Sequence, residues 1–209
     1  MIYNVYLIRH AKTQSNFEGR YTGVTDEPLH EAGSKMLAEK IKTGYYPEVG
    51  QVYVSPTKRC RQTAEMIYPN LSLKVVPGFA EYNFGDFEGS NYQELKDNLS
   101  YRKWVESGGK ERAPGGEDIL SYKKRCYQAF EEVLEEIRQQ KIRNTALIIH
   151  GGTIMAILEK YVPSDNGFYS WQVKNCEGYK LAVIEELWKN VKVIKHYRHL
   201  NYNLVSFDN

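Results

Sequence analysis

Short apolar runs alternate with amphipathic stretches along most of the chain. Four of these runs are rich in β-branched and aromatic residues, a composition typical of buried strands. They span residues 3–8, 51–54, 71–76 and 145–149. The stretches between them place apolar residues three or four positions apart, as one face of a helix does. These stretches span residues 31–43, 56–69, 118–139 and 151–158.

The order of these elements predicts the fold class. Strands that alternate with helices indicate an α/β fold with a mostly parallel sheet. Ser55 and Pro56 are typical of a helix start, with the serine as cap and the proline at the first helical position. The polar segment 11–30 predicts a loop, and two β-like runs at 179–185 and 191–197 predict a hairpin or edge strands.

Residues 79–116 break this periodicity. They are rich in aromatic residues, glycine and charge, and they predict only short helical pieces around 92–95 and 102–106. The whole chain has the length of about one domain. We therefore expect a single domain over residues 1–209 with a cap or insertion at about 79–116, called the cap segment below.

Composition and charge narrow the class of protein. The chain has 28 Lys and Arg against 26 Asp and Glu, and its net charge of +2 falls short of a nucleic-acid footprint. Its three cysteines are widely spaced, which argues against a disulfide framework and a CxxC metal site. No stretch approaches the roughly 20 apolar residues of a membrane span, and the N-terminus lacks signal-peptide features. We expect a cytoplasmic protein without nucleic-acid or membrane partners.

Two histidines occupy equivalent places at the ends of predicted strands. Arg9 and His10 directly follow the first strand, and His150 and Gly151 directly follow the fourth. Ligands of open α/β sheets bind outside the carboxyl ends of the strands, so both histidines are expected to face one crevice. The helix that starts after His150 adds free N–H groups and a positive dipole end, which suit an anion. A lone histidine is more often structural, but the pair favours an anion site.

Two further charged residues also follow predicted strands. Arg59 comes after the second strand, where it competes with two basic neighbours for an inward position. The alternative for all three is a solvated helix face. Glu81 comes after the third strand, in a segment that also carries Asp86 and Glu88. Glu81 is the candidate general acid, whereas neighbouring glycines favour turn roles for Asp86 and Glu88.

Together these blocks resemble the histidine phosphatase superfamily, the phosphoglycerate-mutase-like proteins, in their order and spacing. The residues that carry the resemblance are Leu7–Thr13, Arg20, Gly23, Asp26–Leu29, Gly33, Ser55–Ala64, Glu81, Phe84–Gly89 and His150–Gly151. Ala11 departs from the family, which usually has Gly after Arg-His, and Lys12 replaces a common Glu. We expect catalysis to survive the Ala11 departure.

The resemblance implies a three-layer α/β sandwich and a metal-independent phosphatase without a cofactor. It assigns His10 as the nucleophile that forms a phosphohistidine, with Arg9 and Arg59 on the phosphoryl oxygens. His150 is implied to be a further donor, and Glu81 is implied to protonate the leaving oxygen and then to activate water. Further residues implied to bind phosphate or substrate are Asn16, Thr22, Gly23 and Gly151.

The chemistry places one demand on the nucleophile that a structure can test. A histidine attacks phosphorus only when it is neutral. A backbone carbonyl on its other ring nitrogen would hold the required tautomer.

The substrate and two alternative functions stay open. A small phosphomonoester is expected, and Pro114–Glu117 is similar to the branch with alpha-ribazole phosphatases and broad-specificity acid phosphatases. The alternatives are a phosphoglycerate mutase and a non-catalytic phospho-ligand-binding protein. The second alternative is disfavoured because both histidines, both arginines and the glutamate are present. A homodimer is left open.

Tyrosine is unusually frequent, with 17 Tyr against 7 Phe and 3 Trp. Tyr82, Tyr92 and Tyr101 fall within the cap segment, close to Phe84 and Trp104. Because tyrosine has an apolar body and a polar tip, these residues indicate a half-polar lid over a phosphate pocket. The rings could stack on an aromatic leaving group, or they could form the small core of the cap itself, which we favour for most of them.

Overall fold

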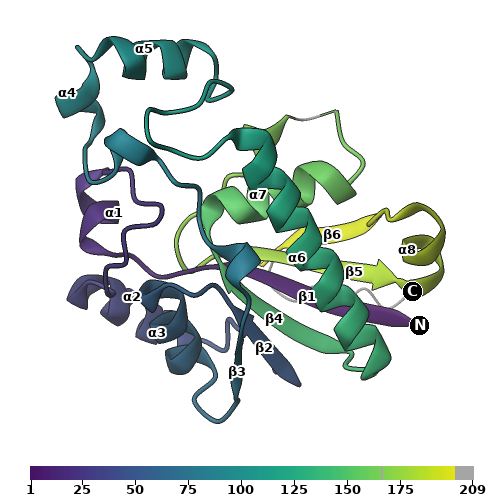
Figure 1. Cartoon of the computed structure of the whole chain (residues 1–209). Helices are drawn as coiled ribbons and strands as arrows, with labels where there is room; N and C mark the ends of the chain where they lie inside the picture. Colours follow the sequence, from purple (N-terminus) through teal and green to yellow (C-terminus); the bar gives the residue numbers. More distant parts are fainter. Residues whose placement is uncertain (166, 201–209) are drawn as a thin grey trace.

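A computed structural model describes residues 1–165 and 167–200. Its centre is a six-stranded sheet in the order β3-β2-β4-β1-β5-β6, flanked by helices (Figure 1). The strands are β1 (Ile2–Arg9), β2 (Gln51–Val54), β3 (Leu73–Val75), β4 (Asn144–Ile149), β5 (Gly178–Ile184) and β6 (His196–His199). The first four are mutually parallel where they pair, whereas β5 and β6 are antiparallel to their neighbours. The predicted fold class is confirmed.

Helices cover both faces of this sheet. They are α1 (Gln14–Glu18), α2 (Glu31–Lys42), α3 (Lys58–Ile67), α4 (Tyr92–Leu95), α5 (Leu99–Glu106), α6 (Ile119–Gln139), α7 (Gly151–Tyr161) and α8 (Glu185–Val191). Three short 3-10 helices complete the set: η1 (Pro77–Phe79), η2 (Gly85–Phe87) and η3 (Phe168–Trp171).

Alternation along β1 shows how the two faces are filled. Val5 and Leu7 belong to the core cluster under α6 and α7, which includes Phe130. Tyr6 and Ile8 point to the other face, where they join Cys60 and further residues of α3. Successive side chains of a strand point to opposite faces, so one central strand is buried on both sides.

One predicted loop contains a helix. Helix α1 begins at a capping box between Thr13 and Asn16 and ends at Gly19, whose φ of 64° is left-handed. A five-residue helix is too short to show an apolar period. Only its caps mark it in the sequence.

Two other predicted boundaries are wrong. Helix α3 starts at Lys58, with Thr57 as its N-cap, and not at Pro56. The reason is that Ser55 still continues the sheet, with its N–H donating to the carbonyl of Ile148 at 3.1 Å. The run 191–197 is not a strand over its length, because α8 occupies 185–191 and β6 begins only at His196. The two strands nevertheless pair at the sheet edge, as expected.

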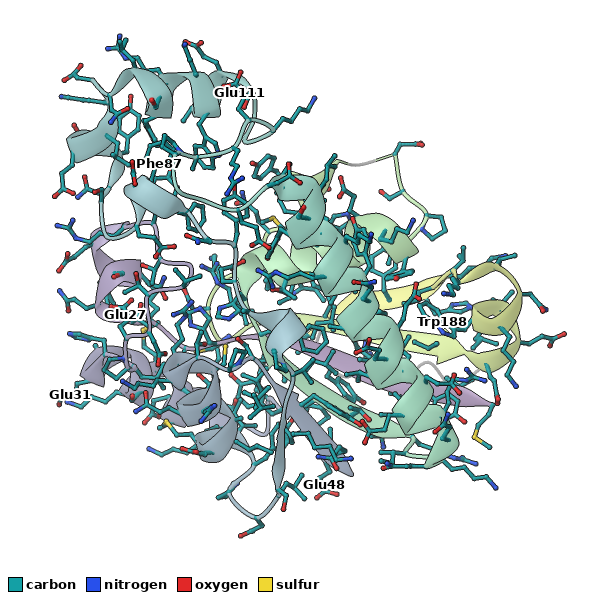
Figure 2. All side chains as sticks on the ribbon, viewed as in Figure 1. Glu27, Glu31, Glu48, Phe87, Glu111 and Trp188 are labelled. Atoms are coloured by element: carbon teal, nitrogen blue, oxygen red, sulfur yellow. The ribbon has the colours of Figure 1, made fainter. Side chains whose placement is uncertain are left out.

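The cap segment has a small core of its own. Phe87, Leu95, Tyr101 and Ala113 are buried against one another. Figure 2 shows Phe87 and Glu111 at one end of the molecule, whereas Trp188 lies beside the β5–β6 edge. The aromatic residues of this segment therefore pack together, as favoured for most of them, although Tyr92 is exposed.

The cysteines and the hydropathy of the helices were the subject of two expectations from composition. Cys60, Cys126 and Cys176 are all free and buried. Within the described residues, no helix combines the length and the apolar character that crossing a membrane requires.

Candidate active site

The two histidines meet because their strands are neighbours. Strand β1 pairs in parallel with β4, with Arg9 opposite Ile149, so His10 and His150 leave the same edge of the sheet. Their ring centroids are 5.2 Å apart and the rings meet edge to face. Both side chains are almost fully buried, at 4% and 1% exposure. The predicted convergence of these strand ends is thus observed.

The ring of His10 is held in one tautomer. Its Nδ1 lies 2.7 Å from the carbonyl oxygen of Ala11. A carbonyl only accepts, so Nδ1 carries the hydrogen and Nε2 keeps its lone pair. Burial lowers the pKa of His10 well below its ordinary value, and the charges of Arg59 and Arg9 lower it further. The ring is therefore neutral, with the unprotonated nitrogen free of this contact.

His150 is also neutral, with the opposite tautomer. Its Nδ1 accepts from the Arg59 guanidinium at 3.4 Å, so its Nε2 donates to the hydroxyl of Ser55 at 2.7 Å. Burial lowers the pKa of His150 well below its ordinary value, and the charges of Arg59 and Arg9 lower it further. An anion placed here would oppose these charges and favour the protonated ring.

Arg59 is the basic residue of its segment that points inward. It is 1% exposed, whereas Lys58 and Arg61 are exposed to solvent. Its guanidinium donates to the carbonyls of Thr25 and Gly23, both at 2.7 Å. Of these three basic neighbours, Arg59 is therefore the one whose side chain points into the protein.

Arg9 stands on the other side of the histidine pair. It donates to the carbonyl of Val173 at 2.7 Å. The Nε atoms of Arg9 and Arg59 are buried and find no acceptor within the described part of the chain. There, neither guanidinium forms an ion pair with a carboxylate, so both keep charge and donors for an anion.

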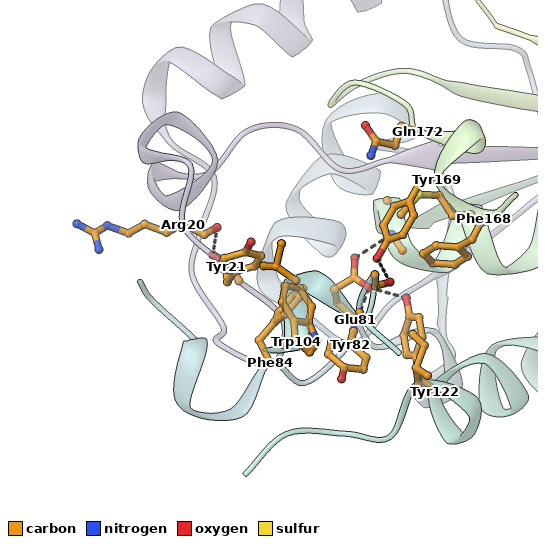
Figure 3. A pocket seen from close by; sticks show the side chains of 18 of the residues that line it. Arg20, Tyr21, Glu81, Tyr82, Phe84, Trp104, Tyr122, Phe168, Tyr169 and Gln172 are labelled. Carbon is orange, nitrogen blue, oxygen red and sulfur yellow. Dashed lines mark hydrogen bonds between the residues drawn. The ribbon is translucent and has the colours of Figure 1, made fainter. Parts of the chain in front are cut away.

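The carboxylate of Glu81 lies against the N-terminus of α7, although Glu81 itself belongs to the cap segment. Its Oε1 accepts from the hydroxyl of Tyr122 at 2.5 Å and from the N–H of Tyr82 at 2.9 Å. Its Oε2 accepts from the N–H of Gly152 at 3.2 Å (Figure 3). A Cβ at position 152 would lie 2.5 Å from Oε1, so only glycine allows this approach. The positive end of the helix dipole also faces this carboxylate.

A third arginine, in α6, fixes the backbone that carries Glu81. Arg125 donates to the carbonyls of Ala80 at 2.6 Å and Glu81 at 2.9 Å. The same guanidinium pairs with the carboxylate of Glu117 through two contacts of 2.8 Å. The Pro114–Glu117 block thus contributes to positioning Glu81, a link that sequence reasoning missed.

The loop between α1 and α2 joins the cap segment to Arg59. Glu88 accepts from the N–H groups of Gly23 (3.0 Å) and Val24 (3.1 Å) and from the hydroxyl of Thr25 (2.7 Å). The carbonyls of the same loop bind Arg59, as described above. The N–H of Gly23 is therefore already hydrogen-bonded to Glu88. A Cβ there would lie 1.7 Å from the carbonyl oxygen of Tyr82.

Asn16 is connected to His10 through a residue that sequence reasoning missed. The side-chain amide of Asn175 donates to the carbonyl of His10 at 2.9 Å and to Oδ1 of Asn16 at 3.1 Å. Asn175 lies in the segment before β5, where no motif marks it. Its role follows only from the fold.

A cavity of about 660 Å³ opens over this centre. The predicted site residues that line it are Arg9, Asn16, Thr22, Glu81 and Gly151. His10, Arg59 and His150 do not line it and are buried, and Gly23 is likewise not part of the lining. Most of the aromatic residues in the remaining lining come from the cap segment and η3.

The two departures from the family motif have local explanations. Ala11 is fully buried in a cluster with Leu37 and Cys176, so its methyl group fills apolar space. Its N–H still donates to the hydroxyl of Thr63 at 3.0 Å. The amine of Lys12 lies 4.8 Å from the ring centroid of Phe17.

Fold and site together define an α/β protein whose buried His–Arg centre lies at the carboxyl ends of parallel strands. A family model of the histidine phosphatase superfamily (branch 1) matches residues 5–195, and the chain belongs to this superfamily. The resemblance seen in the sequence motifs is thereby confirmed.

Three known proteins illustrate the relationship. Phosphoserine phosphatase 1 of Hydrogenobacter thermophilus is 30% identical over 150 residues, 68% of either chain. A 2,3-bisphosphoglycerate-dependent phosphoglycerate mutase of Gloeobacter violaceus is 29% identical over 161 residues, 73% of this chain and 72% of the relative. The structure of the alpha-ribazole phosphatase from Shigella flexneri shows the same fold, with a TM-score of 0.79 at 22% identity over 99% of this chain and 100% of that one.

Proposed function

We propose that this protein is a metal-independent phosphomonoesterase that works through a phosphohistidine at His10. One observation carries the proposal: the Nδ1–H of His10 is bound to the carbonyl of Ala11, which leaves Nε2 with its lone pair. Two arginines without carboxylate partners in the described structure lie beside this ring. A neutral nucleophile beside fixed cations suits attack on an anionic phosphoryl group.

In the first step, Nε2 of His10 attacks phosphorus and the bond from phosphorus to the ester oxygen breaks. Arg9 and Arg59 hold the phosphoryl oxygens through charge-assisted hydrogen bonds. Glu81, in its protonated form, transfers its proton to the leaving oxygen. The products of this step are a free alcohol and a phosphohistidine.

In the second step, water attacks the phosphohistidine. Glu81, now a carboxylate, accepts the proton of the water as the phosphorus–nitrogen bond breaks. Inorganic phosphate leaves, and His10 regains its lone pair. Tyr122 and Gly152 hold the two carboxylate oxygens throughout, so that one group serves as acid and then as base.

His150 supplies a donor that responds to the ligand. The negative phosphoryl group opposes the arginine charges and so favours protonation of this ring. A protonated His150 adds positive charge where negative charge develops in the transition state. The fixed cations then take the place that a metal ion holds in other phosphoryl-transfer sites.

The experiment compares wild type with His10→Ala on benzyl phosphate in excess EDTA. Wild type is expected to release phosphate and, after a rapid quench in alkali, to carry one phosphoryl group on His10 by mass spectrometry. The variant is expected to do neither while keeping its thermal unfolding midpoint. Near-normal turnover by the variant, or loss of wild-type activity in EDTA, would overturn the proposal.

A further inference from the structure

The cavity over Glu81 has two aromatic walls. One wall consists of Tyr21, Phe84 and Trp104, and the other of Phe168 and Tyr169 from η3. Figure 3 shows these two groups on either side of Glu81. A ligand whose phosphoryl group reaches Arg9 must place the rest of its structure between them.

The first wall is preformed. The ring centroid of Tyr21 is 5.1 Å from that of Phe84 and 5.6 Å from that of Trp104. The Tyr21 hydroxyl lies 2.8 Å from that of Tyr101, which is buried in the small core of the cap segment. Rings held in place by their neighbours lose little freedom when a flat ligand packs on them.

The second wall closes against the cap segment. The hydroxyl of Tyr169 donates to the carbonyl of Gly108 at 3.0 Å, and the Phe168 ring centroid is 5.1 Å from that of Tyr169. A Cβ at Gly109 would approach the Tyr169 hydroxyl to 2.8 Å, so glycine keeps this contact open. The second wall is therefore held to the cap segment at Gly108.

The charged side chains of the cavity lining disfavour a leaving group that carries a second anionic group. The charged side chains of the described lining are Arg9, Arg20 and Glu81. Arg9 belongs to the phosphoryl site. Arg20 pairs with Glu18 and Glu94 and also donates to the carbonyl of Gly89 at 2.6 Å, and it points away from the cavity in Figure 3.

A second anionic group of the substrate would consequently meet no uncommitted cation among the described lining residues. A carboxylate or second phosphate placed between the aromatic walls would lose hydration without gaining an ion pair in return. An uncharged flat ring loses little by the same transfer and gains contact with several rings.

On the basis of the proposed function, we propose that the preferred substrate is the phosphomonoester of an alcohol whose body is an uncharged aromatic ring system. The cavity volume falls within the usual range for small-molecule sites of about 300–1,000 Å³. The aromatic walls select the leaving group, and the arginines and histidines bind the phosphoryl group.

The test compares alkyl phosphates with similar leaving oxygens, so that aromatic contact is the variable. The substrates are benzyl phosphate, cyclohexylmethyl phosphate, para-carboxybenzyl phosphate and O-phosphoserine. We expect kcat/KM for benzyl phosphate to exceed that for phosphoserine and for the carboxylated analogue by about tenfold or more. The kcat/KM for benzyl phosphate should also exceed that for cyclohexylmethyl phosphate. Equal or higher kcat/KM with phosphoserine would overturn the inference.

Variants on both walls complete this test. Trp104→Ala and Phe168→Ala are each expected to lower kcat/KM for benzyl phosphate about tenfold and to leave that for phosphoserine within about twofold. Tyr197→Ala is the matched control, because its ring is 42% exposed and does not line the cavity. Phe168 lies outside the cap segment, so it tests the inference even where Trp104→Ala disturbs folding. Equal losses on both substrates would contradict an aromatic site.

A binding measurement separates this inference from the proposed function. Calorimetry compares benzylphosphonate with the phosphonate analogue of phosphoserine, neither of which requires turnover. Preferential binding of benzylphosphonate supports the aromatic site even where no phosphohistidine forms, a result that would refute only the mechanism. Phosphohistidine formation together with tighter binding of the serine analogue would refute only the aromatic site.

Discussion

The hydroxyl of Tyr122 donates to Oε1 of Glu81 at 2.5 Å, across 41 positions of the chain. Tyr122 is completely buried in α6, and burial together with the Glu81 charge raises its pKa well above its ordinary value. The phenol therefore stays protonated at neutral pH and remains a donor. This pair connects the longest helix to the proposed acid and base.

Tyr122→Phe removes this donor and keeps the ring. We expect kcat for benzyl phosphate to fall about tenfold with KM nearly unchanged, because Glu81 is less well oriented while the phosphoryl ligands remain. Steady-state kinetics measure the split. Tyr127→Phe in the same helix is the control, and an effect confined to KM would contradict a positioning role.

Glu81→Gln separates the two chemical steps. The amide can neither give up a proton to the leaving oxygen nor accept one from water, so kcat should fall by about 10²–10³. With para-nitrophenyl phosphate, whose leaving group needs no proton, the first step is spared and phosphohistidine should accumulate. Quenched-flow mass spectrometry detects it. Fast release of phosphate by this variant without accumulation would assign the base elsewhere.

Arg59→Lys tests whether a bidentate guanidinium is required. Lysine retains the charge but cannot reach two loop carbonyls and a phosphoryl group together. We expect a loss of about 10²–10³ in kcat/KM. The control is Arg61→Lys, two residues further along α3, whose exposed side chain should leave kcat/KM within about twofold. Unchanged kinetics of Arg59→Lys would show that only the charge matters.

Acid should destabilise the fold through the two histidines. The pKa values of His10 and His150 are both lowered on folding, so the unfolded chain binds more protons at acidic pH. Stability should therefore fall as pH falls below about 6.5, by up to about 1.4 kcal/mol per pH unit for each histidine. Urea denaturation at several pH values measures this slope. His150→Gln should reduce it, and an identical slope in that variant would contradict the assignment.

Supplying 3-phosphoglycerate with a bisphosphoglycerate primer distinguishes phosphatase from mutase. A mutase must bind the substrate carboxylate, and the described cavity lining has no uncommitted cation for it. We expect slow release of phosphate and no 2-phosphoglycerate. Nuclear magnetic resonance of phosphorus identifies both products, and formation of 2-phosphoglycerate at a comparable rate would establish the mutase.

The sequence alone was enough to predict the site residues whose positions depend only on where they stand relative to nearby strands. Arg9 ends β1, His10 and His150 directly follow β1 and β4, and parallel strands bring their carboxyl ends together. Inward orientation of Arg59 required the fold, because its basic neighbours have the same local signal. The same holds for the cap residues, whose aromatic rings were compatible with a core or with a ligand site.

Other site residues could not be predicted because their contacts join distant parts of the chain. Asn175 reaches the carbonyl of His10 across 165 positions, and Arg125 reaches that of Glu81 across 44. Neither has a motif or a period that separates it from ordinary polar residues. The helix start near Pro56 failed for a related reason, since pairing of Ser55 with β4 outweighed its capping preference.

The loop at residues 23–25 has a consequence for the electrostatics of the site. Its amides face the Glu88 carboxylate, and its carbonyls face the Arg59 guanidinium, so peptide groups stand between two opposite charges. Direct contact would neutralise both charges within the protein. Instead, the loop N–H groups bind the negative charge and the loop carbonyls bind the positive one, so the two form no direct ion pair in the described structure. The loop therefore keeps the buried guanidinium from pairing with a carboxylate, as the proposed binding of a phosphoryl group there requires.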